Sequence, residues 1–322
     1  MTDPTLSIVV CTYQRSECLG RLLDSLVMQD QRDFEVVIVD AGETSSESAR
    51  HAARFRKATG DQVRVSLVPS VKGLPRQRNV GLANASGDIV CFLDDDVTVE
   101  ETFVSHICRT LEQPEMADVG GVTGYDVLHY GVSASMRYRI RRALGFYRRF
   151  LPGSVGICEA TVPLTFQAPF CGSMDIGWLP GFCMAYRRRA IAQLRFDEEL
   201  TAYGAEDAVF SLNIGRAWRL MMIGDLLVRH DSTPLARTSN AEAVYGASFA
   251  LARSYFARSR GAWAFAAIAW YAAVEFCLDS LTVLRRPSLC QIRIVWARLA
   301  GLLEGIRSVR TSQQAVGAGG RV

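Results

Sequence analysis

Three consecutive carboxylates, Asp94, Asp95 and Asp96, follow an apolar run in the segment CFLDDDVTVE, residues 91–100. Because side chains alternate along a strand, we expect Asp94 and Asp96 to share one face and Asp95 to point away, which makes Asp95 the most replaceable. Two carboxylates on one face suit Mg²⁺ or Mn²⁺, whose shell is completed by water and a substrate phosphate. A solvated acidic turn that caps the next helix explains the same residues.

A second acidic pair, Glu206-Asp207, is the best candidate for a general base. Neighbouring residues on a helix point in different directions, so we expect only one of the two to address a substrate. The alternative is a pair of acids favoured by the dipole at a helix N-terminus.

The elements that must position these groups alternate between strand and helix patterns in the first half of the chain. Apolar β-rich runs alternate with helical patterns, and this predicts an α/β fold with a doubly wound parallel sheet. Ligands bind such sheets at the carboxyl ends of the strands. We expect strands at 6–11, 34–40, 63–69 and 88–94, and helices after Ser16, over 45–59, from Pro75, and from a capping box at 98–101.

Composition limits the class of protein. The chain has 322 residues, 49% hydrophobic and 21% charged, and a net charge of +3 that gives no argument for a nucleic-acid partner. Its nine cysteines include no CxxC pair, and the N-terminus runs into a strand without a signal-peptide layout. We therefore expect a reduced, cytoplasmic location, at the inner face of the cell membrane.

The last third of the chain is basic and apolar. Residues 261–284 are long enough to span a bilayer, but Glu275 and Asp279 lie within them, and each would cost about 2.5–3.5 kcal/mol near the centre. Flanking arginines and aromatic residues favour a helix in the membrane interface, that is, peripheral contact. The segment RYRIRRALGFYRR, residues 137–149, would add to this contact or bind the pyrophosphate of a lipid-linked acceptor. The alternative is a helical cap on the sheet.

Two families place such acidic residues at a strand end. HAD-type phosphohydrolases use a DxDx[TV] motif that residues 94–98 fit literally. That hypothesis needs a downstream lysine, or sometimes an arginine, and no lysine follows Lys72. Gly224-Asp225 also lacks the second acid, and the motif does not lie on the first strand of the chain, where it normally occurs.

The chain resembles glycosyltransferase family 2 through five ordered motifs within residues 6–231: VVCTYQR, FEVVIVDAG, GLPRQRNVGLANASGDIVCFLDDDV, WLPGFCMAYRR and YGAEDAVFSLNIGRAW. The resemblance implies a GT-A fold with a C-terminal helical extension. It implies an inverting, metal-dependent hexosyl- or deoxyhexosyltransferase of polysaccharide or glycolipid biosynthesis. The donor would be a UDP-, GDP- or dTDP-sugar, and the acceptor a saccharide or a lipid-linked molecule. A non-catalytic nucleotide-binding scaffold of the same fold is the competing hypothesis.

The resemblance also implies roles for individual residues. Asp96, with Asp94 and a late histidine, His230, would hold Mg²⁺ or Mn²⁺ at the diphosphate. Asp207 would take the acceptor proton while Glu206 orients the acceptor or base. Trp178 would stack on an acceptor sugar, and Gly181 would let the backbone approach it. The residues expected at the nucleotide sugar are Thr12, Tyr13, Arg15, Asp40, Arg78, Asn79, Asp94 and Asp95.

Two positions depart from the family pattern: Gln14 stands where Asn is usual, and Ala41-Gly42-Glu43 where Asp-Gly-Ser is common. The other three histidines, His51, His106 and His129, lack partners in the sequence, and we expect them to be structural. We expect residues 1–125 to bind the nucleotide sugar, 126–240 to hold the acceptor and catalytic base, and 241–322 to form the basic helical extension.

Overall fold

The chain divides into two compact units in the computed structural model, which describes residues 4–42, 46–200, 205–231, 240–259 and 261–318. The first unit comprises Met1–Ser133, Pro163–Glu198 and Phe210–Pro234. The second comprises Ala134–Val162, Glu199–Val209 and Leu235–Val322. The division expected from the sequence, at residues 1–125, 126–240 and 241–322, separates the chain by function rather than by compactness. It stays a prediction, because these two units do not test it.

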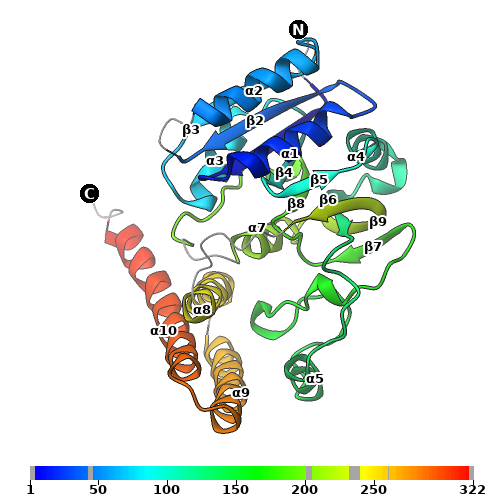
Figure 1. Cartoon of the computed structure of the whole chain (residues 1–322). Helices are drawn as coiled ribbons and strands as arrows, with labels where there is room; N and C mark the ends of the chain where they lie inside the picture. The colour runs from blue at the N-terminus through cyan, green and yellow to red at the C-terminus, as the bar shows by residue number, and fades with distance from the viewer. Residues whose placement is uncertain (1–3, 43–45, 201–204, 232–239, 260, 319–322) are drawn as a thin grey trace. The chain divides into compact units, whose positions relative to one another are not determined.

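The first unit contains a nine-stranded sheet whose first half is parallel (Figure 1). Strands β3 (Arg64–Pro69), β2 (Phe34–Asp40), β1 (Leu6–Thr12) and β4 (Ile89–Asp94) lie side by side in this order and all run the same way. The four strands expected from the sequence are confirmed, because runs that are apolar throughout suit strands covered on both faces.

The second half of the sheet is mixed. Strand β8 (Cys183–Arg187) lies antiparallel between β4 and β6 (Val119–Asp126), and β9 (Arg219–His230) runs parallel to β6. Two short strands, β5 (Val97–Val99) and β7 (Ser173–Ile176), pair antiparallel with β9. Because β8 is antiparallel to both of its neighbours, β4 and β6 run in the same direction. The carboxyl ends of β1, β4, β6 and β9 therefore lie at the same edge of the sheet.

Helices α1 (Ser16–Val27), α2 (Ser46–Ala58), α3 (Leu74–Asn84) and α4 (Phe103–Glu112) follow the parallel strands, and short α6 (Arg188–Ile191) follows β8. The expected leucine stripe of α1 is buried. The capping box predicted at residues 98–101 is wrong. Residues 97–99 form β5, where β-branched Val97, Thr98 and Val99 pair with the end of β9, and α4 begins only at Phe103.

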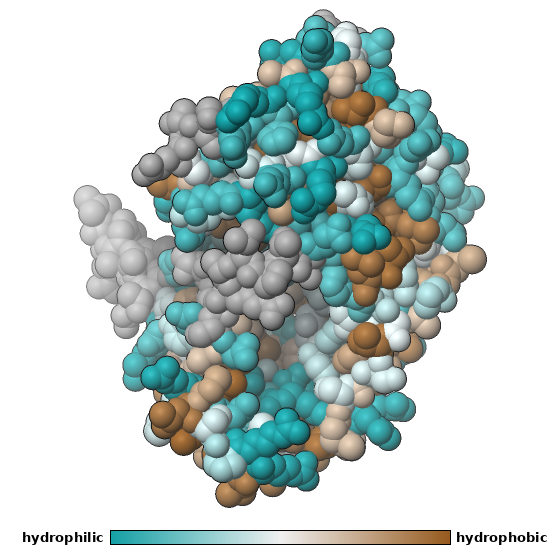
Figure 2. All heavy atoms as spheres, in the orientation of Figure 1, coloured by the Kyte–Doolittle hydropathy of each residue, from teal (hydrophilic) through white to brown (hydrophobic). Residues whose placement is uncertain are grey.

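Two apolar clusters cover the two faces of the sheet, one containing Leu22 of α1 and Phe55 of α2, the other Leu82 of α3. The outer surfaces of α1 and α2 are polar, and hydrophilic side chains predominate in the upper part of Figure 2. This three-layer arrangement leaves the carboxyl edge of the strands for polar side chains.

The second unit is mostly helical, with α5 (Met136–Ala143), α8 (Asn240–Arg258), α9 (Ala262–Arg285) and α10 (Leu289–Ala318), and it includes the start of α7 (Glu206–Ile214). Helix α10 packs closely on α8 through Gly301 and Gly305. A Cβ at Gly301 would lie 2.4 Å from the carbonyl oxygen of Tyr245, and one at Gly305 would lie 2.5 Å from that of Phe249. Larger residues would push the two helices apart.

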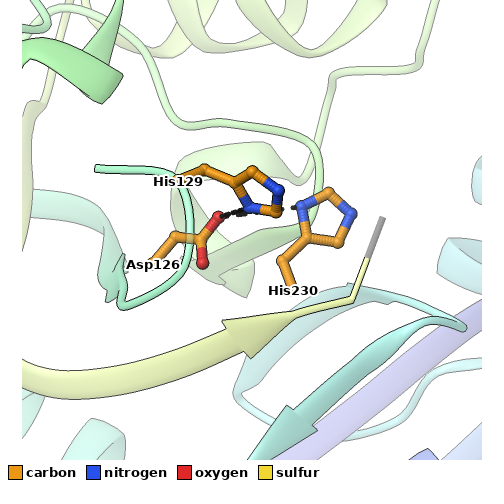
Figure 3. Close-up of side chains that lie close together, drawn as sticks. All are labelled: Asp126, His129 and His230. Atoms are coloured by element: carbon orange, nitrogen blue, oxygen red, sulfur yellow. Dashed lines mark hydrogen bonds and ion pairs between the residues drawn. The ribbon is translucent and has the colours of Figure 1, made fainter. Parts of the chain in front are cut away.

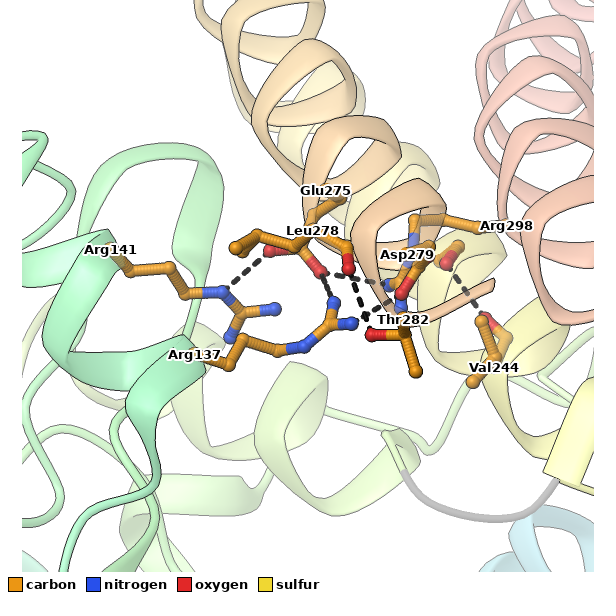
Figure 4. A network of polar contacts seen from close by, with 9 residues as sticks. Arg137, Arg141, Val244, Glu275, Leu278, Asp279, Thr282 and Arg298 are labelled. Atoms are coloured by element: carbon orange, nitrogen blue, oxygen red, sulfur yellow. Dashed lines mark hydrogen bonds and ion pairs between the residues drawn. The ribbon is translucent and has the colours of Figure 1, made fainter. Parts of the chain in front are cut away.

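Helix α9 is the one described helix that is long and apolar enough to cross a bilayer by length and composition, which is weak evidence for a span. Its two acids face the protein (Figure 4). Glu275 accepts hydrogen bonds from Arg137 at 2.5 Å and Arg141 at 2.7 Å, and Asp279 accepts one from Arg298 at 2.7 Å. Arg137 and Arg141 were expected to contact a membrane or a pyrophosphate, but in the structure they bind the acids of α9 within the protein.

Candidate active site

Three strand ends meet at the carboxyl edge of the sheet and bring together groups that are far apart in the sequence. Strand β5 pairs Val97 with His230, and the amide of Asp231 donates to the carbonyl oxygen of Asp96 at 2.9 Å. On the other side of β9, Asp126 at the end of β6 pairs with Val228. Backbone pairing therefore places the acidic triplet, Asp126 and His230 side by side.

Asp94, Asp96 and His230 form one group that fits a divalent cation, with one ligand atom of each within 4.8 Å of the others. Oδ1 of Asp96 is buried, accepts no hydrogen bond from any described residue, and lies 3.3 Å from Nε2 of His230. Two carboxylates and one imidazole suit Mn²⁺ or Mg²⁺. All three residues are predicted from the sequence to hold this cation.

The electrostatics of this group favour an ionised Asp96. Burial alone would raise the pKa of Asp96, but the contacts with His230 and Arg15 outweigh it and lower the pKa to about 2. Burial alone would lower the pKa of His230, but the carboxylates around it raise it above its ordinary value of 6.5. Asp96 is therefore ionised, and the positive charge of Arg15 and of protonated His230 beside it stabilises the carboxylate.

Asp95 does not point away from its neighbours as we expected, because Arg15 contacts both Asp95 and Asp96, and its easy replacement stays a prediction. Strand β4 ends at Asp94, so alternation along a strand does not extend to Asp95. Asp95 is 3% exposed, accepts a hydrogen bond from Oγ1 of Thr12 at 2.7 Å, and pairs with Arg15 at 2.9 Å. Burial raises its pKa to about 7, against the opposing charge of Arg15. Asp95 links the triplet to the end of β1.

Asp126 and His129 lie beside the candidate cation group and were not predicted from the sequence, and His129 is not the isolated residue that we expected. Nδ1 of His129 lies 2.7 Å from Oδ2 of Asp126, and Nδ1 of His230 lies 3.9 Å from the same oxygen (Figure 3). These three residues form a second group whose ligand atoms lie close enough together to hold a metal ion. Their one sequence signal is an acid at a strand end followed three residues later by a histidine.

The nucleotide-side residues lie at the ends of β1 and β2. Thr12 and Arg15 contact the acidic triplet, and the ring of Tyr13 lies 4.5 Å from Nζ of Lys72. Asp40 is 7% exposed, and its Oδ1 accepts a hydrogen bond from the amide of Gly42 at 2.7 Å. All of them lie at the carboxyl edge where the resemblance places the donor, and donor contact stays a prediction.

Gln14 departs from the family pattern at a strained position. Its φ of 55° lies in the left-handed region, where Asn is better tolerated than most residues. The Asn usual in the family suits this conformation, and this chain holds Gln there instead.

Arg78 and Asn79 of α3 make internal contacts. Arg78 is 2% exposed and contacts Asp94 at 3.4 Å and the carbonyl oxygen of Gly181 at 3.2 Å. Asn79 donates to the carbonyl oxygen of Phe196 at 2.9 Å and accepts from its amide at 2.8 Å. Asn79 thus holds two loops together, and Arg78 connects Asp94 to the segment of Gly181.

Nε1 of Trp178 is buried and has no hydrogen-bond acceptor among the described residues, and contact of Trp178 with an acceptor sugar stays a prediction. Glu206 and Asp207 form the first turn of α7, where the helix dipole favours acids. Glu206 is 5% exposed. Both acids belong to the second unit and the acidic triplet to the first, so a joint active site stays a prediction.

Comparison with known proteins identifies the family. Residues 7–195 match glycosyl transferase family 2. The chain belongs to this family. It is 26% identical over 250 residues to the GalNAc(5)-diNAcBac-PP-undecaprenol beta-1,3-glucosyltransferase of Campylobacter jejuni, covering 75% of this chain and 71% of that enzyme. Two other bacterial glycosyltransferases are matched over only 26% and 32% of their length.

Solved structures show that the family 2 chain has the GT-A fold. It is similar to the mannosyltransferase PcManGT of Pyrobaculum calidifontis in complex with GDP-Man and Mn²⁺, with a TM-score of 0.55 and 17% identity over 95% of this chain and 88% of that one. It is similar to S. aureus TarS 1-349 in complex with UDP-GlcNAc, with a TM-score of 0.56 and 18% identity over 97% and 92%. The expected fold is confirmed, and the phosphohydrolase alternative has no support.

Proposed function

We propose that this family 2 protein is an inverting, metal-dependent glycosyltransferase that moves a hexose or deoxyhexose from a nucleotide sugar to a hydroxyl group. The observation that carries the proposal is the cation group of Asp94, Asp96 and His230 at the carboxyl edge of the strands. This edge is where open α/β sheets bind their ligands. The solved relatives named above contain GDP-Man with Mn²⁺ or UDP-GlcNAc.

The proposed chemistry is a single displacement. The carboxylate of Asp207 accepts the proton of the acceptor hydroxyl, whose oxygen forms a bond to the anomeric carbon as the bond from that carbon to the diphosphate breaks. Asp94, Asp96 and His230 would hold a divalent cation, which would stabilise the negative charge of the departing diphosphate. Arg15, which pairs with Asp95 and Asp96, keeps both carboxylates in place.

The proposal is tested by nucleotide release from a panel of UDP-, GDP- and dTDP-sugars with Mn²⁺ or Mg²⁺. We expect Asp96→Asn to lose both cation binding and release, and Asp207→Asn to lose release while still binding the nucleotide. The matched control is Asp24→Asn, an exposed carboxylate on α1. A wild type that binds UDP or GDP and releases nothing from any donor would favour the non-catalytic scaffold instead.

We also propose that the acceptor is lipid-linked and that the second unit contacts the bilayer. Helix α9 has its two acids inside and several large apolar side chains outside: Glu275 is 0% exposed, whereas Trp263 is 87% and Leu284 78% exposed. After the turn, Leu289 is 77% and Trp296 68% exposed. We call Trp263, Leu284, Leu289 and Trp296 the α9–α10 apolar face. Helices that lie in a membrane interface present such a face.

The charge around this face supports an anionic membrane as the proposed partner. Arg285, Arg286 and Arg293 are exposed, and the sequence has no acid between Asp279 and Glu304. Each arginine near an anionic bilayer contributes about 1 kcal/mol of attraction. The name of the Campylobacter jejuni relative specifies an undecaprenol-linked substrate, which agrees with work at a membrane.

Membrane contact is tested by flotation of the full chain with liposomes. We expect binding to phosphatidylglycerol vesicles, weak binding to phosphatidylcholine, and loss of binding in Trp296→Ser. The control is Val71→Ser, which changes an apolar residue of the first unit that is 63% exposed. If Trp296→Ser dissociates a dimer in sedimentation and leaves flotation unchanged, the face binds a second copy rather than lipid.

A further inference from the structure

The group of Asp126, His129 and His230 lies beside the proposed cation site and shares His230 with it. Its ligand atoms lie within 4.8 Å of one another, and Figure 3 shows both imidazole rings next to the Asp126 carboxylate. Asp126 is 1% exposed, and its Oδ1 accepts a hydrogen bond from the amide of Leu128 at 3.0 Å, which leaves Oδ2 for the histidines. The ring of His129 is 42% exposed, so the group is open to solvent.

The donor atoms of the two groups differ in type. Two imidazoles with one carboxylate suit a borderline metal such as Zn²⁺, whereas the carboxylate-rich group at Asp94 and Asp96 suits Mg²⁺ or Mn²⁺. We propose that Asp126, His129 and His230 form a second cation site that takes Zn²⁺, and that its occupation excludes Mn²⁺ from the site at Asp96.

The exclusion follows from the single lone pair of a neutral imidazole. His230 turns Nε2 toward Asp96 at 3.3 Å and Nδ1 toward Asp126 at 3.9 Å, and only one of these nitrogens can bind a metal while the other keeps its proton. With Zn²⁺ on Nδ1, the proton is on Nε2 and donates toward Asp96. With Mn²⁺ on Nε2, the proton is on Nδ1 and donates toward Asp126.

The surroundings hold His230 where both groups can use it. The ring of Phe182 stacks on that of His230 with centroids 5.1 Å apart and an interplanar angle of 20°. The backbone of His230 is paired with Val97, and its neighbour Asp231 is bonded to Asp96. A ring fixed in plane and position changes its metal by changing its tautomer rather than by moving.

Zn²⁺ binding is measured by calorimetry on the full chain without nucleotide. We expect one Zn²⁺ per chain in the wild type, binding at least about tenfold weaker in His129→Gln, and unchanged binding in the control His106→Gln. Bound Mn²⁺, followed by electron paramagnetic resonance, should be released by one equivalent of Zn²⁺ in the wild type and retained in His129→Gln. Competing thiol sites are removed by replacing the exposed cysteines with serine: Cys171, Cys277 and Cys290.

Equal Zn²⁺ affinity in wild type and His129→Gln would overturn the site, and simultaneous binding of both metals would overturn the exclusion. The exclusion rests on the proposed function, because it concerns the cation of the donor site, but Zn²⁺ binding itself does not. A protein that binds Zn²⁺ through His129 and transfers no sugar would overturn the proposed function and leave the Zn²⁺ site standing.

Discussion

Replacing Glu275 with Gln should open α9 from the rest of the second unit. The side chain is 0% exposed and contacts Arg137, Arg141 and Arg298. Burial alone would raise the pKa of Glu275, but the three arginines lower it, so Glu275 is ionised at neutral pH. Glu275→Gln removes one of the two carboxylates that face these arginines and leaves their charge uncompensated in an apolar setting.

The expected size follows from the burial. Removing one partner of a buried ion pair costs about 3–5 kcal/mol, and Arg137 is 28% exposed, so we take the lower end. A loss of about 3 kcal/mol is a large part of the about 5–15 kcal/mol that stabilises a folded protein. It corresponds to a fall in melting temperature of about 6–12 °C.

The assay is hydrogen exchange of α9, because two compact units need not unfold in a single step. We expect faster exchange in Glu275→Gln and little change in Cys277→Ser, which alters an exposed residue on the same helix. A double-mutant cycle with Arg141→Gln should give a coupling of at least about 1 kcal/mol. A loss below about 1 kcal/mol, the value of a surface pair, would refute the reasoning.

Three further predictions test other parts of the structure. Asp95→Asn should lower the free energy of unfolding by about 1–3 kcal/mol, because Thr12 and Arg15 lose buried carboxylate oxygens that both of them contact. An unchanged free energy in urea denaturation would show that Asp95 is easily replaced. Mn²⁺ binding should weaken as pH falls through the raised pKa of His230, since the protonated ring cannot bind a metal. Without metal, the His230–Asp96 pair stabilises the fold fully below pH 6.5, and this stabilisation is lost as pH rises through the raised pKa of His230. An unchanged pH profile of Mn²⁺ binding and of stability in His230→Asn would contradict both expectations. Gly305→Ala should lower the melting temperature although alanine favours helices, because its Cβ would lie 2.5 Å from a carbonyl oxygen of α8; an unchanged melting temperature would show that α8 and α10 can separate freely.

The candidate site was only partly predictable from the sequence. Asp94, Asp96 and His230 were assigned to the cation, and the structure brings them together. Asp126 and His129 were missed, because a histidine three residues after an acid is common and has no meaning until β6 and β9 pair. Asp95 was misjudged, because the rule of alternating side chains was extended one residue beyond the end of β4.

The sequence by itself determined the parallel half of the sheet, its helices and the family, since these depend on local periodicity and on ordered motifs. Tertiary structure decided which distant groups meet. The β5–β9 pairing places His230 at Asp96, and α5 and α10 supply arginines to the acids of α9. Such contacts join residues as much as 142 positions apart, as for Arg137 and Asp279, and depend on the packing of whole elements, which no local pattern encodes.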